Sequence, residues 1–158
     1  MTHTVAGMNT LIPGLGYRDP RAASRFLIDA LGFTQVRWYE DRATGEVHHA
    51  ELRAPNGAVV SLHSGAEGNT IADLTARAAD DSYPPFGLHL NTDDPDTAYA
   101  RALAAGATVV RELQDRFTGT RGFIVSDPEG LYWSVSTPLP PMERAAEGQW
   151  RPVTPAQG

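Results

Sequence analysis

The sequence has no cysteine, no net positive charge and no long apolar run. Without cysteine there can be no disulfide, thiolate metal site or thiol nucleophile. The 13 basic and 19 acidic side chains give a formal net charge of −6, so we expect no nucleic-acid partner. No apolar segment approaches the roughly 20 residues of a membrane span, and the opening MTHTVAGMNT lacks a signal peptide's basic and apolar regions. We therefore expect a cytoplasmic protein with no membrane partner.

The length predicts a single domain over residues 1–158. At roughly 150 residues per domain, a chain of 158 residues has no room for a second full-sized one. Folding at this size buries about 68–70% of the extended-chain surface, so a core can form without disulfides or a structural metal.

Two helical patterns in the sequence share the same start and end signals. Asp19-Pro20 opens the first pattern, and Asp94-Pro95 opens the second 75 residues later. In both, aspartate suits the N-cap and proline suits the first helical position. Gly32 and Gly106 follow the two patterns and suit the left-handed position after a helix end.

A second pair of matching segments lies downstream, in the same order. Ala54-Pro55-Asn56-Gly57 precedes one half-apolar strand pattern, and Asp127-Pro128-Glu129-Gly130 precedes another, 73 residues later. Proline and glycine at this spacing indicate turns. Two matches at nearly equal offsets predict an internal duplication.

Each copy is expected to form one strand, one helix and three further strands (βαβββ). Module one spans about 9–64, with elements at 9–17, 20–31, 34–40, 46–53 and 58–64. Module two spans about 86–137, with elements at 86–92, 95–105, 107–113, 121–126 and 131–137. A linker over 65–85, with a short helix near 70–79 as one option, joins them, and an extended tail covers 138–158.

Side-chain alternation assigns each strand residue to one of two sheet faces. Leu15, Val60, Leu62, Leu90, Trp133 and Val135 are expected beneath the helices, with Ala50 and Leu52. The opposite face is expected to carry Ile12, Gly14, His49, Glu51, Val59, Ser61 and His63 in module one, and Gly87, His89, Asn91, Tyr132, Ser134 and Ser136 in module two. Such a polar but mostly uncharged face suits a ligand surface, and a merely hydrated sheet face is the alternative.

These features resemble the vicinal oxygen chelate superfamily (glyoxalase, bleomycin-resistance and extradiol dioxygenase proteins). The resemblance rests on the two βαβββ copies, on Tyr17-Arg18-Asp19 and Leu31-Gly32-Phe33 around the first helix, and on Arg121-Gly122-Phe123 before Asp127-Pro128-Glu129-Gly130-Leu131-Tyr132-Trp133. It implies an α+β fold in which two modules form a curved mixed sheet around a cavity. The family includes isomerases, lyases, dioxygenases and drug-sequestering proteins, so it does not fix the activity.

Enzymes of this family hold a divalent metal with histidine, glutamine or glutamate from the first and last strand of each copy. The resemblance puts those positions at Ile12, Ser61, Gly87 and Ser134, and none offers an imidazole or a carboxylate. We therefore expect no metal and no other cofactor.

The histidines leave three hypotheses open. His49, His63 and His89, with Glu51 nearby, could form a displaced metal site, donate hydrogen bonds within a pocket, or serve only the structure. His49 and Glu51 are also the catalytic candidates, since they could act as a proton-transfer pair.

The remaining candidates bind a ligand by hydrogen bonds or stacking. Arg121 could hold a carboxylate or form a surface salt bridge. Tyr132 could stack on a flat ligand, as could Trp38, Tyr39 and Phe123, although core packing is the default for any one of them. Ser61 and Ser134 lack the Gly-X-Ser-X-Gly context of a nucleophile and are taken as ligand-binding hydroxyls.

The sequence thus favours a metal-independent small-molecule-binding protein of the bleomycin-resistance type. Its ligand-binding set is His49, Ser61, His63, His89, Arg121, Tyr132 and Ser134. The expected ligand is an aromatic or cationic compound such as an antibiotic, the latter favoured by the negative net charge. The alternative is a glyoxalase- or lyase-like enzyme that uses the His49–Glu51 pair or a displaced metal. A homodimer is expected from the family and from the open sheet edges.

Overall fold

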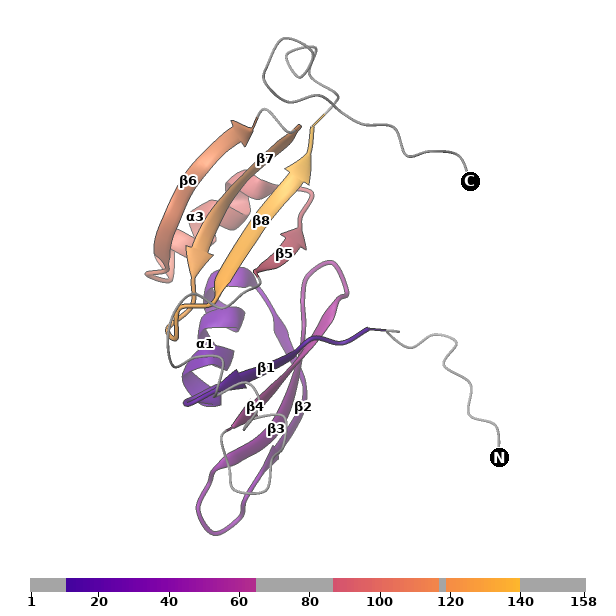
Figure 1. Cartoon of the computed structure of the whole chain (residues 1–158), viewed down its shortest axis with the longest axis vertical. Helices are drawn as coiled ribbons and strands as arrows, with labels where there is room; N and C mark the ends of the chain where they lie inside the picture. Colours follow the sequence, from indigo (N-terminus) through magenta and orange to yellow (C-terminus); the bar gives the residue numbers. More distant parts are fainter. Residues whose placement is uncertain (1–10, 65–86, 117–118, 140–158) are drawn as a thin grey trace, which may run out of the picture.

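The computed structural model describes residues 11–64, 87–116 and 119–139 (Figure 1). They form two βαβββ modules, each with its own four-stranded mixed sheet, and the two sheets follow one another along the long axis. The predicted α+β class with two βαβββ modules is therefore confirmed. The linker helix expected near 70–79 and the tail from residue 140 lie outside the described residues, and the single-domain division stays a prediction.

Module one contains β1 (Gly14–Tyr17), α1 (Pro20–Leu31), β2 (Thr34–Glu40), β3 (Val47–Arg53) and β4 (Val59–Ser64). Its sheet has the order β1-β4-β3-β2, in which β1 runs parallel to β4 and the other neighbours are antiparallel.

Module two repeats that plan with β5 (Leu88–Asn91), α3 (Pro95–Ala104), β6 (Thr108–Arg116), β7 (Thr120–Ser126) and β8 (Tyr132–Pro138). The sheet order is β5-β8-β7-β6, again with one parallel pair between the first and last strands.

Both helices begin and end as the sequence predicts. The Asp19 side chain accepts a hydrogen bond from the Ala22 backbone N–H, and the Asp94 side chain accepts one from that of Thr97. Gly32 and Gly106 each have φ of 75°, a conformation that costs glycine little because it has no Cβ.

The strand register makes the two modules equivalent residue by residue. Gly14 pairs with Ser61 between β1 and β4, and His89 pairs with Ser134 between β5 and β8. These pairs are related by the offsets of 75 and 73 that the sequence shows. Ser61 and Ser134 therefore occupy the same place in the two sheets, as the duplication predicts.

The helix-facing sides of both sheets contribute to one apolar core. Leu15, Leu62, Leu90 and Val135 are all buried there, as the alternation predicts. The edge of the Phe33 ring meets Trp133 of the other module, with ring centroids 5.6 Å apart, and α1 packs against α3. This contact between modules fixes one repeat against the other.

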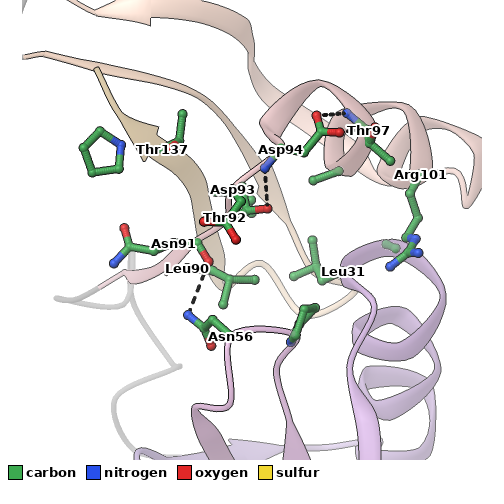
Figure 2. A pocket seen from close by; sticks show the side chains of 15 residues that line it. Leu31, Asn56, Leu90, Asn91, Thr92, Asp93, Asp94, Thr97, Arg101 and Thr137 are labelled. Carbon is green, nitrogen blue, oxygen red and sulfur yellow. Dashed lines mark hydrogen bonds between the residues drawn. The ribbon is translucent and has the colours of Figure 1, made fainter. Parts of the chain in front are cut away.

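Two equivalent turns add polar contacts between the modules. Glu129, in the turn before β8, accepts hydrogen bonds from the backbone N–H groups of Arg18 (2.9 Å) and Asp19 (2.7 Å). Asn56, at the equivalent place before β4, donates to the Asn91 carbonyl at 3.3 Å (Figure 2). Each turn therefore reaches the segment at the end of the other module's first strand.

A buried hydrogen-bond cluster strengthens one of these two contacts. The Tyr17 hydroxyl donates to Asp127 Oδ2 at 2.6 Å, and the Trp133 indole N–H donates to the same oxygen at 3.3 Å. Burial and the nearby Asp127 carboxylate raise the pKa of Tyr17 far above its usual value, so the phenol stays protonated. Neither helix within the described ranges is long and apolar enough to cross a membrane.

Candidate functional site

Each sheet has one face beneath its helix and an opposite face that no described helix covers. Face one, in module one, carries Arg37, Tyr39, His49, Glu51, Ser61 and His63. Face two, in module two, carries His89, Arg111, Arg116, Gly122, Ile124, Tyr132, Ser134 and Ser136. The register confirms the predicted assignments, because His49 lies opposite His63, and His89 lies opposite Ser134.

Face one carries a connected row of polar side chains. The Ser61 hydroxyl lies 3.0 Å from His63 Nε2, and the rings of His63 and His49 have centroids 4.9 Å apart. His49 Nε2 lies 3.3 Å from Glu51 Oε1, and Arg37 Nε lies 3.6 Å from Glu51 Oε2. The predicted His49–Glu51 pair therefore exists, at a distance near the long limit of a hydrogen bond.

His63 is held in its neutral form at neutral pH. Its side chain is buried, and burial lowers the pKa of His63, with a smaller contribution from the nearby imidazoles of His49 and His48. A neutral imidazole has one donor and one acceptor nitrogen, so His63 can exchange one hydrogen bond with Ser61 and keep the other nitrogen for a second partner.

Face two is hollow where face one is filled. A shallow pocket of about 390 Å³ opens on it, lined by Gly87, Leu88, His89, Val110, Ile124, Tyr132 and Ser134. His89 Nε2 lies 2.9 Å from the hydroxyl of the fully buried Ser136. The Ser134 hydroxyl is buried without a hydrogen-bond partner. This pocket combines apolar walls with a few polar groups, as small-molecule sites do.

The predicted ligand-binding residues divide into two groups and one exception. His49, Ser61 and His63 lie together on face one, whereas His89, Tyr132 and Ser134 lie together on face two. The structure places Arg121 on the helix side of module two. Its guanidinium there donates to Asp96 at 2.7 and 2.9 Å and to Asp115 at 2.8 Å.

The engagement of Arg121 takes it out of the candidate site. Hydrogen bonds to Asp96 and Asp115 raise the pKa of Arg121, so the group stays charged and paired within its own module. The surface salt bridge that the sequence left as the alternative is the arrangement observed. The aromatic candidates also divide: Phe123 lies in the core and Trp38 stacks under Arg21, whereas Tyr39 is exposed on face one.

Sequence reasoning missed the arginines of face two. Arg116, at the end of β6, has Nε and Nη2 buried without a partner, and Arg111 lies on the same face. Burial, and to a smaller degree the charge of Arg111, lower the pKa of Arg116. Register irregularities between Val109 and Gln114 shift the alternation of β6, so a simple period of two could not have assigned these side chains to a face.

The residues at the family's metal-ligand positions do not suit a metal. Ile12 is apolar and 40% exposed, Gly87 has no side chain, and Ser61 and Ser134 offer only neutral hydroxyls. The displaced set of three histidines does not assemble within one chain, because His49 and His63 belong to one sheet and His89 to the other. Across residues 11–64, 87–116 and 119–139, no three His, Asp or Glu side chains converge to hold an ion.

A larger cavity of about 500 Å³ lies at the seam between the modules (Figure 2). Several of its polar groups serve the structure. Asp94 accepts from the backbone N–H and the hydroxyl of Thr97, and the Thr92 hydroxyl accepts from the backbone N–H of Asp94. Asn56 holds the Asn91 carbonyl across the seam. The faces, rather than this seam, therefore carry the candidate site.

Comparison with curated proteins gives relatives of similar length. The uncharacterised protein Rv0887c of Mycobacterium tuberculosis strain H37Rv is 37% identical over 135 residues, covering 82% of this chain and 74% of that protein. The uncharacterised protein Mb0911c of Mycobacterium bovis is also 37% identical over 135 residues, covering 82% of this chain and 83% of the relative.

Solved structures share the fold. TioX from Micromonospora sp. ML1 is 27% identical, with a TM-score of 0.61 over 83% of this chain and 99% of TioX. UcmS2 is 17% identical, with a TM-score of 0.61 over 82% of this chain and 98% of UcmS2, which shows the fold alone. A family model for the glyoxalase/bleomycin resistance protein/dioxygenase superfamily matches residues 3–135. The resemblance seen in the sequence is therefore confirmed, and the chain belongs to the glyoxalase/bleomycin resistance protein/dioxygenase superfamily.

Proposed function

We propose that this protein binds a small aromatic molecule on face two, without a metal ion. The observation that carries this proposal is the pocket of about 390 Å³, in which Val110, Ile124 and Tyr132 supply apolar contact. His89 and Ser134 supply the polar groups that would orient a ligand. Membership in a family that includes bleomycin-resistance proteins supports a binding role.

Local charge separates the two ligand classes that the sequence leaves open. The net charge of −6 favours a cation at long range. The charged side chains assigned to face two, however, are Arg111 and Arg116, and its β5, β7 and β8 positions are all uncharged. A short-range contact outweighs a screened long-range field, so an aromatic body is the part of the expectation that we retain.

Three probes of one shape test this proposal: 2-naphthamide, 2-naphthoate and 2-naphthylmethylamine, titrated by calorimetry. At least one is expected to bind the full chain, and Tyr132→Ala or His89→Ala is expected to weaken it at least fivefold. Tyr39→Ala, a matched loss of an aromatic side chain on face one, should leave the affinity unchanged. Absence of binding by all three probes at millimolar concentration would contradict the proposal.

Metal independence is tested in the same titrations. Dialysis against a chelator should leave probe affinity unchanged, because no strong ligand stands at the family's metal positions. Loss of binding on chelation, restored by zinc, nickel or manganese, would overturn the metal-free proposal.

A catalytic role is the second candidate, and the His49–Glu51 pair favours it. A carboxylate 3.3 Å from an imidazole is the arrangement of a proton-transfer pair, and the neutral His63 ring lies beside it. Turnover of methylglyoxal with a thiol by the chelated protein, abolished in both His49→Gln and Glu51→Gln, would favour this candidate. Binding without turnover favours the first.

We further propose that the protein acts as a homodimer in the cytoplasm. β2 and β6 are edge strands of their sheets, and unpaired sheet edges need a partner or cover. Light scattering should therefore give about twice the 17.0 kDa of one chain, and a monomer at micromolar concentration would contradict the dimer. Fractionation of cells that produce the full chain tests the compartment.

A further inference from the structure

Two side chains stand out for buried polar atoms that nothing satisfies. Within the described ranges, the buried side-chain nitrogens and oxygens without a hydrogen-bond partner are Arg116 Nε, Arg116 Nη2 and Ser134 Oγ. Leaving such groups unpaired is costly, and the cost is highest for a charged group. Native proteins rarely keep such atoms without a role, so a missing partner is the natural explanation.

Both side chains belong to face two. Arg116 pairs with Thr120, which in turn pairs with Pro138, whereas Ser134 lies opposite Ile124, four residues further along the same two strands. Four residues span roughly 13 Å of strand, and the arginine side chain covers part of that distance. Gly122, between the two rows, carries no side chain that would separate them.

Other arginines of the chain show what Arg116 lacks. Arg121 donates to Asp96 and Asp115, Arg21 to Glu40, and Arg37 lies 3.6 Å from Glu51. Arg116 is more buried than these exposed pairs and has a cation, Arg111, as its charged neighbour. A buried guanidinium without a counter-charge lacks the compensation that keeps such groups stable.

We propose that the ligand of face two carries a carboxylate, which Arg116 binds through its two free nitrogens while Ser134 hydrogen-bonds the aromatic body. This inference rests on the proposed function and names the chemical class of its ligand. Guanidinium donors in a fixed fork match the two oxygens of a carboxylate, and the contact supplies the missing charge. The pocket around Ile124 and Tyr132 then receives the rest of the molecule.

The test compares 2-naphthoate with 2-naphthamide, which differ in charge but hardly in shape. The wild-type chain should bind the carboxylate at least tenfold more tightly than the amide. Arg116→Gln should abolish that preference while binding of the amide persists. Arg25→Gln removes the same charge from α1 in module one and should keep the full preference.

A spectroscopic readout covers the case in which Arg116→Gln does not fold. The Arg116 Nε–H group is buried, and its nitrogen–proton signal in the wild-type spectrum, assigned by its loss in Arg116→Lys, should shift saturably with 2-naphthoate and not with 2-naphthamide. Equal affinity for both probes with no shift would overturn this inference and leave the proposed function standing. Failure of both probes and of the cationic analogue would contradict the two together.

Discussion

The two modules build the same contact from opposite strands. Module one has Gly14 and His63 where module two has His89 and Ser136. In module one His63 on β4 reaches Ser61 at 3.0 Å, and in module two His89 on β5 reaches Ser136 at 2.9 Å. A histidine–serine pair therefore persists although the histidine has changed strand. Its geometry follows from the shared register and not from a shared residue.

The faces differ most on their third strands. His49 and Glu51 of β3 are replaced at equivalent positions of β7 by Gly122 and Ile124, because each pair lies opposite equivalent residues of β4 and β8. Ionisable side chains fill face one, whereas glycine and an aliphatic residue leave room on face two. The comparison explains why the pocket opens in module two, and it suggests changes that would break the contrast.

The largest effect is expected at the turn before the last strand, where Asp127 corresponds to Ala54. The Asp127 carboxylate accepts hydrogen bonds from Tyr17, Trp133 and the backbone of Glu129 and Leu131. Asp127→Ala removes all four and leaves the Tyr17 hydroxyl buried without a partner. We expect a loss of about 4 kcal/mol in the free energy of unfolding, measured by urea denaturation.

Tyr17→Phe is the matched control for that variant. It removes one of the four bonds and leaves Asp127 with its other donors, so a loss of about 1 kcal/mol is expected. If Asp127→Ala cost no more than Tyr17→Phe, the carboxylate would not be what joins β1 to this turn.

The next effect tests the hollow in face two. A Cβ on Gly122 would collide with Ser136 and with the backbone oxygen of Val135. Gly122→Ala should therefore destabilise the protein by about 3 kcal/mol, since overpacking forces backbone shifts. His49→Ala, at the equivalent position of module one, should cost less than about 1 kcal/mol because that side chain is half-exposed. Similar losses in the two variants, measured by thermal unfolding, would remove the contrast between the faces.

How far the sequence predicts this molecule follows from the same contrast. The Asp-Pro starts, the Gly32 and Gly106 ends and the two proline–glycine turns are local signals, and each is observed where the sequence put it. Alternation also assigns His63 and Ser134 to the correct faces, because β4 and β8 pair with their neighbours without irregularity.

Other parts of the site depend on geometry that no local pattern encodes. Arg121 falls on the helix side, where Asp96 and Asp115 hold it, and the sequence does not show that these residues meet. The irregular register of β6 hides the direction of Arg116. The burial that leaves its nitrogens unpaired depends on packing across several strands, so only the structure reveals it.

A smaller effect separates the two equivalent turns. Glu129 accepts from two backbone N–H groups at the start of α1, whereas Asn56 donates one bond of 3.3 Å to Asn91. We expect Glu129→Ala to lower the free energy of unfolding by about 1 kcal/mol and Asn56→Ala by about half as much. Urea denaturation of both variants gives the order, and a larger loss at Asn56 would reverse the comparison.

The smallest effect concerns pH and the buried His63. Its pKa is lowered in the folded protein, so as pH falls below about 6.5 the unfolded chain takes up a proton that the folded chain resists. Folding stability should therefore decrease with acidity from about pH 6.5 down to the folded pKa of His63. His63→Asn should flatten this part of the stability–pH curve, because asparagine keeps polar atoms near Ser61 without titrating. Proton NMR of the His63 ring provides the direct check: a midpoint below 6.5 is expected, and one at or above 6.5 would mean that burial on face one does not disfavour the charged ring.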